Sequence, residues 1–346
     1  MTWQRESKQR GCNGFTFVAM NDGKVRWGIL GCGAIATSAV APAMRWARGG
    51  ELRAVGSRTE ERARERAHAV EAPVAYGSYE ALLADPEIDV VYLGLPNGEH
   101  ARWARAAAAA GKHVLCEKSL TLSIDEAREL RALFATRGLR LVEAFMVRHH
   151  PQWARLRTLL DEIGPVDHVR AVMRARHGVE SDHRWSPTLG GGALFDVTCY
   201  PVNLARFVYG AEPKRVRASA RWKARCVDAS TDALLEFGDG RIASVHGSLD
   251  GAAEEGAVVS GKRGRITIAR PFVPGWAPTE LVVETDIGTS VHAVPGANHY
   301  LHMIEHVEAL VRDPGLTLAP AEDGVDNVAV LVAMSLSART GGTIAL

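Results

Sequence analysis

The sequence predicts an α/β chain in two parts: a doubly wound parallel sheet at the N-terminus, then an α+β domain with an open, mostly antiparallel sheet. Between Val25 and Phe145, unbroken apolar runs alternate with helical patterns, which is typical of parallel strands covered by helices on both faces. After Pro151 the chain carries long runs of alternating apolar and polar residues, which indicate antiparallel strands. This change of pattern places a domain boundary near residue 146.

In the first part, each apolar run is followed by a helical or small-residue segment. The unbroken run 89–95 and the alanine-rich helix after it form the plainest pair. Ser123 precedes a helical pattern and Glu126 follows it by three residues, a spacing that caps a helix N-terminus. The expected strands are 25–30, 52–57, 89–95, 113–118 and 139–145, and the expected helices include 60–69, 79–84, 101–110 and 123–136.

The second part begins with a helix over 153–162 and continues with extended runs. Phe237 to Arg241, between two alternating runs, indicates a hairpin turn. The pattern of the last two predicted helices allows them to pack on either domain. The expected strands are 167–176, 214–224, 233–249, 264–269 and 280–285, and the expected helices are 192–209, 300–311 and 323–338.

Composition limits the classes of function. The chain has 346 residues and a formal net charge of +1. Its length suits two domains, expected at 24–146 and 147–346, after a disordered extension at 1–23. The balanced charge argues against a nucleic-acid binder, and no apolar stretch approaches the ~18 residues of a membrane span. Five scattered cysteines without a CxxC pair favour neither disulfides nor a metal site, and they predict the reducing cytoplasm.

The string GCGAIA (31–36) follows the first strand and opens a helix. In dinucleotide sites of this pattern, the first glycine makes a tight turn and the second lets the backbone approach the pyrophosphate. The pyrophosphate then lies at the helix N-terminus, where free N–H groups attract anions. We therefore predict a Rossmann domain whose cofactor contacts Gly31, Gly33, Ala34 and Ile35.

The end of the second strand bears on the choice between NAD and NADP. NAD sites usually place a carboxylate there, whereas this chain has Ser57 and Arg58, and Glu60 comes only in the next helix. In our interpretation Arg58 binds a 2′-phosphate through charge-assisted hydrogen bonds, with the hydroxyls of Ser57 and Thr59 beside it. NADP is therefore the expected cofactor, with NAD as the alternative.

Polar residues follow three further strands, where ligands of an open parallel sheet gather. Lys118 comes directly after an apolar run and is expected to be partly desolvated, which favours proton transfer. The last strand end carries Glu143 and Arg148. The predicted cofactor contacts at these ends are Leu95, Pro96, Asn97, His100, Glu117 and Lys118.

In the second half, the string GGGALFDVTCY (190–200) leads three glycines into a helix. It places Asp196 and Tyr200 four residues apart on one helical face, where both can act on one substrate. Taken alone, the same string fits a capped helix with a core tyrosine equally well.

The two halves together resemble the glucose-fructose oxidoreductase, inositol dehydrogenase and dihydrodiol dehydrogenase family from Val25 to the C-terminus. The resemblance rests on GCGAIA, LPNGEH, EKS, EAFMVRHHPQ, GGGALFDVTCYP and NHYLHMIEH in this order. It implies hydride transfer between NAD(P) and a hydroxyl-bearing carbon of a sugar, polyol or dihydrodiol, in a homodimer or homotetramer. With Tyr200 and the run 143–146, the chain is similar to the dihydrodiol and xylose or glucose dehydrogenase branch, where NADP is common.

The resemblance also implies roles for single residues. Tyr200 is the expected general acid/base, Lys118 lowers its pKa, and Asp196 orients the lysine or a second hydroxyl. Two positions depart from the family pattern. Ser119 replaces the proline of a Glu-Lys-Pro motif, which we expect to loosen the loop, and Val147 stands where close relatives often have an aromatic residue. Weaker candidates for substrate contact are Arg148, His183, Arg184 and His299.

Three rival functions are weighed against this one. An NAD-dependent glycoside hydrolase on the same fold releases sugars without net cofactor turnover. A non-catalytic dinucleotide-binding regulator has no need of the Lys118, Asp196 and Tyr200 set. A metalloenzyme is the third rival, because three histidines share one helical face, but no carboxylate cluster accompanies them and we predict no metal. These histidines are His299, His302 and His306.

Overall fold

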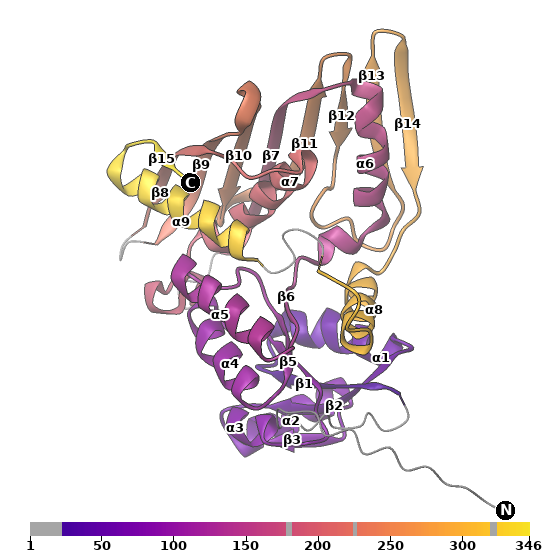
Figure 1. Ribbon diagram of the computed structural model, residues 1–346, viewed down its shortest axis with the longest axis vertical. Coiled ribbons are helices and arrows are strands. Elements are labelled where there is room, and N and C mark those ends of the chain that lie inside the picture. Colours follow the sequence, from indigo (N-terminus) through magenta and orange to yellow (C-terminus); the bar gives the residue numbers. More distant parts are fainter. Residues whose placement is uncertain (1–22, 178–181, 224–226, 319–323) are drawn as a thin grey trace, which may run out of the picture.

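A computed structural model describes residues 23–177, 182–223, 227–318 and 324–346. The extension expected at 1–23 lies outside this part of the chain apart from Gly23. The described chain forms two sheets, with the parallel sheet in one half of the molecule and the mixed sheet in the other half (Figure 1).

The N-terminal sheet has six parallel strands in the order β3-β2-β1-β4-β5-β6. The unbroken apolar run of β1 is buried along its whole length. The strand order reverses at β1, so the carboxyl ends of β1 and β4 border the crevice where doubly wound sheets bind ligands. The short strand β3 was not predicted, because three residues give too little pattern. The strands are β1 (Val25–Leu30), β2 (Gly50–Gly56), β3 (Val74–Tyr76), β4 (Val90–Leu93), β5 (His113–Cys116) and β6 (Leu141–Glu143).

Helices cover both faces of this sheet. On one face, α3 (Tyr79–Leu83), α4 (Asn97–Ala109) and α5 (Ile124–Thr136) enclose a core that includes the alanines of α4. On the other lie α1 (Ala41–Trp46) and α2 (Glu60–Val70). The Ser123 hydroxyl accepts the Glu126 N–H, as the capping pattern predicts. Helix α4 begins at Asn97 rather than Ala101, directly after Pro96.

The C-terminal sheet has nine strands in the order β14-β13-β12-β11-β7-β10-β9-β8-β15, antiparallel except for the β7–β10 pair. Strand β11, the partner of β7 over most of its length, was not predicted because its first half is polar and glycine-containing. The exposed strand β14 was missed for the same reason. The strands are β7 (Val166–Arg176), β8 (Arg215–Trp222), β9 (Asp228–Glu236), β10 (Ile242–Ser248), β11 (Asp250–Gly261), β12 (Gly264–Ile268), β13 (Thr279–Thr285), β14 (Gly288–Val294) and β15 (Ile344–Ala345).

One face of the mixed sheet carries α6 (Pro151–Ile163), α7 (Cys199–Tyr209) and α9 (Val325–Thr340) (Figure 1). The expected helix 192–209 contains a π-helical turn at Leu194–Thr198 before α7. The opposite face carries a hollow of about 900 Å³ lined by strands β7 to β12. None of the predicted cofactor or catalytic residues lines it.

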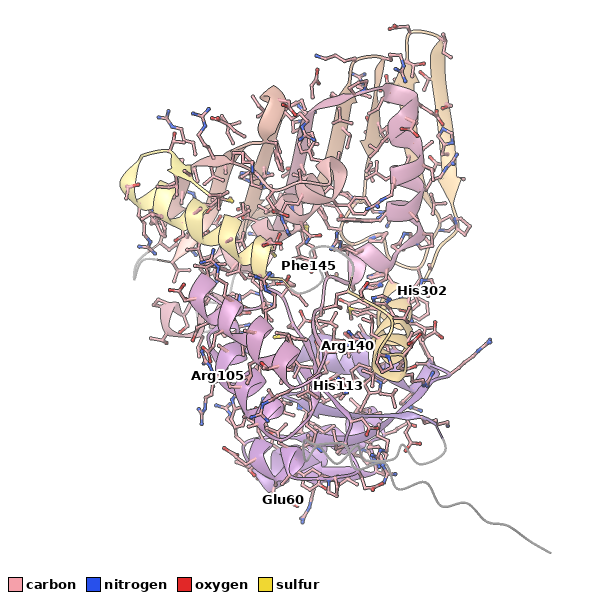
Figure 2. The ribbon with its side chains drawn as sticks, in the orientation of Figure 1. Glu60, Arg105, His113, Arg140, Phe145 and His302 are labelled. Atoms are coloured by element: carbon pink, nitrogen blue, oxygen red, sulfur yellow. The ribbon has the colours of Figure 1, made fainter. Side chains whose placement is uncertain are left out.

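The last two helices connect the sheets. Helix α8 (His299–Arg312) returns to the N-terminal sheet, where Trp27 Nε1 donates to Glu308 Oε1 at 3.1 Å. Helix α9 packs on both α5 and β8. Phe145, labelled at the junction of the two halves in Figure 2, follows β6 by two residues and contacts the Tyr200 ring edge-on. Among the described residues, no helix is long and apolar enough to cross a membrane.

Candidate active site

The glycine turn after β1 has the shape that a dinucleotide requires. Gly31 has a φ of +79°, and a Cβ there would lie 2.4 Å from Leu95 Cδ2. Gly33, in contrast, has no atom within 4 Å of an added Cβ, so its surroundings are open. Ala34 and Ile35 begin the following helix and are exposed. The turn and the free helix N-terminus therefore fit a pyrophosphate, although each contact stays a prediction.

The end of β2 leads into the N-terminus of α2. Ser57 is buried, whereas Arg58 is exposed. The Thr59 hydroxyl accepts the Arg62 N–H at 3.3 Å and caps α2. A helix N-terminus next to an exposed arginine is a favourable place for a phosphate, because both attract negative charge. The side chains present therefore fit a 2′-phosphate.

His100 holds two loops together. Its Nδ1 faces the Ser119 carbonyl oxygen at 2.9 Å, and its Nε2 faces the Leu95 carbonyl oxygen at 2.8 Å. The side chain is fully buried, and burial lowers its pKa. We predicted that His100 contacts the cofactor, but this geometry leaves it no free surface. Its action on the site passes through the loops that carry Leu95 and Lys118.

Ser119 fastens the loop that we expected to be loose. Its hydroxyl donates to the Phe195 carbonyl oxygen at 2.9 Å, a bond that proline cannot make. The side chain is fully buried. The prediction of a loosened loop is therefore wrong, since Ser119 is held by His100 from one domain and by Phe195 from the other.

Lys118 and Asp196 join the two domains. Lys118 Nζ donates to Asp196 Oδ1 at 2.8 Å and to the Asp196 carbonyl oxygen at 2.5 Å. Their side chains are only 11% and 18% exposed. Burial by itself lowers the pKa of Lys118, but the Asp196 carboxylate outweighs it and raises the pKa well above its ordinary value. Lys118 is therefore a cation throughout the neutral range.

The other oxygen of Asp196 binds Arg184. Arg184 Nε donates to Asp196 Oδ2 at 2.8 Å, and Arg184 Nη1 pairs with Asp182 at 3.2 Å. Burial favours a higher pKa for Asp196, but Lys118 and Arg184 hold it well below its ordinary value. Asp196 is thus ionised, with each oxygen bound to a cation. Arg184 acts on Asp196 here, and its predicted contact with the substrate stays a prediction.

The Tyr200 ring lies beside Lys118, but the Tyr200 hydroxyl donates to Met146 rather than contacting the lysine. Lys118 Nζ is 5.1 Å from the ring centroid, whereas the hydroxyl donates to Met146 Sδ at 3.6 Å. Burial raises the pKa of Tyr200 well above its ordinary value, and Lys118 offsets only part of this effect. The prediction of a lowered Tyr200 pKa is therefore wrong for this structure. Near neutral pH the phenol is a proton donor rather than a base.

A carboxyl group, of Glu117, and a phenol, of Tyr300, also interact with Lys118. The Tyr92 hydroxyl donates a hydrogen bond to Glu117 Oε1 at 2.7 Å, and burial raises the Glu117 pKa. Tyr300, at the start of α8, interacts electrostatically with Glu117 and Lys118, and burial raises its pKa. We did not predict Tyr300, because the histidines around it in the string NHYLHMIEH drew attention first.

Other candidates lie apart from Lys118 or have different partners. Arg148 lies over the Phe207 ring, at 5.6 Å from its centroid. His299 is buried against the His150 ring, and burial lowers its pKa to about 4. Val147 is fully buried in the core, so this departure from the family pattern presents no surface to a substrate.

The three histidines of α8 do not converge on one point. His302 Nδ1 lies 3.1 Å from the His149 carbonyl oxygen, and the His306 ring packs on the His149 ring. Within the described ranges, no group of three His, Cys, Asp or Glu side chains is arranged to hold a metal ion. His183 pairs with Asp182 near the Arg184 end of the site.

Comparison with known proteins identifies both halves. Residues 25–145 match a family model described as an oxidoreductase family with an NAD-binding Rossmann fold. Residues 153–267 match the model of the GFO/IDH/MocA C-terminal domain.

Several relatives are similar over most of their length. A D-xylose 1-dehydrogenase (NADP(+)) from Haloferax volcanii is 37% identical over 325 residues, which cover 92% of this chain and 99% of that protein. A trans-1,2-dihydrobenzene-1,2-diol dehydrogenase from Macaca fuscata fuscata is 34% identical over 271 residues, covering 75% of this chain and 78% of that protein. A crystal structure of a 3-ketoreductase from Actinomadura kijaniata, in complex with NADP and TDP-benzene, superposes with a TM-score of 0.86 at 30% identity, covering 91% and 98% of the two chains. The chain therefore belongs to the Gfo/Idh/MocA family of oxidoreductases, whose N-terminal domain is a nicotinamide-dinucleotide-binding Rossmann fold.

Proposed function

We propose that this protein is an NADP-preferring dehydrogenase or reductase acting on a hydroxyl-bearing carbon of a sugar, polyol or dihydrodiol. The observation that carries the proposal is the contact between Lys118 of one domain and Asp196 of the other, with Tyr200 beside them. The names of the xylose, dihydrodiol and keto-sugar relatives support this substrate class.

The proposed roles follow from the charges of these groups. The nicotinamide, when bound, accepts or delivers the hydride. During carbonyl reduction, Tyr200 donates its proton to the substrate oxygen, since its raised pKa keeps the phenol protonated. The Lys118 ammonium stabilises the resulting phenolate and hydrogen-bonds the reacting oxygen, while Asp196 holds the lysine in place.

For these roles the Tyr200 hydroxyl must leave Met146 and face the substrate. The Tyr200 ring packs against Phe145 and Phe272. The hydroxyl therefore changes partner mainly through rotation about its C–O bond and small shifts of the ring. A thioether is a weak acceptor, and a carbonyl oxygen competes with it easily. The substrate is therefore expected to bind between Tyr200 and Lys118.

The cofactor preference rests on Arg58, which is exposed beside the N-terminus of α2. We expect NADPH to bind more tightly than NADH in a titration of nicotinamide fluorescence. In Arg58→Ala the two affinities become similar, because the 2′-phosphate loses its charged partner. Arg48→Ala, a change at another exposed arginine of the same domain, is the control and keeps the preference. Equal affinities in the wild-type protein contradict the proposal.

We also propose assembly into a homodimer or homotetramer through the outer face of the nine-stranded sheet. This face carries the hollow of about 900 Å³ and two partly exposed apolar side chains, Leu234 and Ile242. A cytoplasmic location remains our expectation, and the free, buried Cys32, Cys116 and Cys199 agree with a reducing compartment.

A screen of activity tests the proposed reaction. Aldoses, polyols and trans-dihydrodiols are offered with NADP, and the corresponding carbonyl compounds with NADPH, while nicotinamide absorbance is followed. We expect net oxidation or reduction of at least one member of these classes. Sugar release from glycosides without net cofactor turnover, or tight NADPH binding without any turnover, contradicts the proposal and favours the hydrolase or the regulator.

A further inference from the structure

Asp228, the first residue of β9, is a buried carboxylate that the proposed reaction does not use. Its side chain is 6% exposed. Its Oδ2 accepts the Leu194 N–H at 2.7 Å and the Thr231 hydroxyl at 2.8 Å. Leu194 lies in the first turn of the helical segment, where N–H groups have no carbonyl partner within the helix. A strand of the mixed sheet thus caps the segment that carries Asp196.

Gly192 is shaped around this carboxylate. Its φ is +121°, and a Cβ at this position would lie 2.1 Å from Asp228 Oδ1. The glycine therefore lets the carboxylate approach the helix N-terminus, where the helix dipole favours a negative charge. Gly192 thus provides the space in which Asp228 binds Leu194.

The capped turn is the one that Lys118 contacts from the other domain. Asp196 follows Leu194 by two residues, and Lys118 binds both its carbonyl and its carboxylate. Ser119 also binds this turn, at the Phe195 carbonyl oxygen. A rotation of the turn therefore moves both oxygens of Asp196 that accept from Lys118, and the bond between Asp228 and the Leu194 N–H opposes this rotation.

We propose that Asp228 is a positioning residue that fixes the segment 193–200, so that Asp196 meets Lys118 and Tyr200 lies beside it. Within the part of the chain that the structure describes, Asp228 forms no hydrogen bond or ion pair with these three side chains, and it acts through the Leu194 N–H. The proposal rests on the proposed function, because it assumes that Lys118 and Tyr200 form the reacting centre.

The test compares Asp228→Ala with Asp228→Asn, which keeps an oxygen acceptor for Leu194. We expect the alanine variant to lower kcat by about 10- to 100-fold, in the range of a misplaced catalytic group. The asparagine variant retains most of the activity, within about fivefold of wild type. Asp167→Ala is the matched control, since Asp167 is a surface aspartate of the same domain paired with Lys262, and it leaves kcat unchanged.

The pH profile separates positioning from loss of folded protein. In the wild type, Asp196 keeps Lys118 charged up to high pH. When the turn moves, the Asp196 carboxylate no longer offsets the effect of burial on Lys118, and only the weaker effects of Tyr200, Cys199 and Glu117 oppose it. The alkaline limb of kcat therefore shifts down by more than about one pH unit in Asp228→Ala. The asparagine variant keeps the limb of the wild type. NADPH affinity stays within about twofold in both, because Asp228 is in the other domain.

The proposal is overturned if Asp228→Ala keeps kcat within about twofold, or if it loses activity without any shift of the alkaline limb. If circular dichroism shows that the alanine variant does not fold, Asp228→Leu replaces it, since leucine is close to aspartate in shape and offers no acceptor, with the same expected outcomes. Hydrogen exchange over 193–200, measured without substrate, should quicken in the alanine variant. If wild type shows no turnover, the proposed function has failed, and unchanged exchange there independently contradicts the anchoring role of Asp228.

Discussion

Replacing Asp196 by asparagine removes the charge that Lys118 and the partly buried Arg184 share, while keeping the size of the side chain. Loss of one partner of a buried ion pair generally costs ~3–5 kcal/mol. Here Lys118 keeps the Asp196 carbonyl oxygen and Arg184 keeps Asp182. We therefore expect a loss of about 2–3 kcal/mol in the free energy of unfolding, which lowers the melting temperature of a chain of this length by roughly 3–4 °C.

The pH dependence of this loss follows from the two pKa shifts. The Asp196 pKa is lowered in the folded protein, so its contribution is present above the unfolded value of ~3.9 and is lost as the pH falls through the folded value. The Lys118 pKa is raised, so its contribution is present below ~10.4 and is lost as the pH rises through the folded value. The stability difference is therefore constant from about pH 5 to 9 and shrinks on either side.

The assay is urea unfolding of wild type and Asp196→Asn, followed by circular dichroism from acid to alkaline pH. Turnover is measured on the same samples. Its alkaline limb should shift to lower pH in the variant, since the largest effect that offsets the burial of Lys118 is then removed. Asp167→Ala again serves as the control for loss of a surface carboxylate. A difference in the free energy of unfolding below about 0.5 kcal/mol across this range refutes the view that Asp196 is the essential counter-ion of Lys118.

Three other predictions concern the cofactor turn and assembly. Gly33→Ala should leave the melting temperature nearly unchanged and weaken NADPH binding at least about tenfold, because its Cβ projects into the open space expected for the pyrophosphate. Gly31→Ala should destabilise the protein itself by about 1–3 kcal/mol, since its φ is +79° and its Cβ meets Leu95; equal melting temperatures for the two variants contradict this distinction. Light scattering at micromolar concentration should give a mass of two or four chains, whereas a particle of 37.3 kDa excludes the proposed assembly.

The parallel sheet was predictable because its strands are buried on both faces and leave continuous apolar runs in the sequence. β1 matches its predicted bounds, and α5 starts at the predicted cap. β11 and β14 escaped prediction because the first half of β11 is polar and β14 is exposed on both faces, so neither shows the alternation on which such predictions depend. The family resemblance, based on short strings spread over both halves, is confirmed by the family models.

The sequence predicted which residues belong to the candidate site, but it did not predict how their side chains contact one another. Lys118 and Asp196 are in contact, but their pairing required a fold in which residues 78 positions apart meet. The direction of the Tyr200 hydroxyl depends on packing around Met146, and the burial of His100 depends on two loops. None of these follows from spacing along the chain. Asp228 has no local signal either, because its partner Leu194 lies in another element.

The most direct test of the account is turnover of Tyr200→Phe and Lys118→Met beside their affinity for NADPH. Tyr200→Phe should lower kcat by roughly 10²–10⁴, the usual effect of removing one positioned proton-transfer group. Lys118→Met should be at least as damaging, because it removes the charge that stabilises the phenolate and also the partner of Asp196. The affinity of both variants for NADPH should stay close to that of wild type, since the pyrophosphate and 2′-phosphate contacts lie at Gly31, Gly33 and Arg58 in this account. Near-normal turnover of Tyr200→Phe contradicts the assignment of Tyr200 as the proton donor and leaves it as a packing residue.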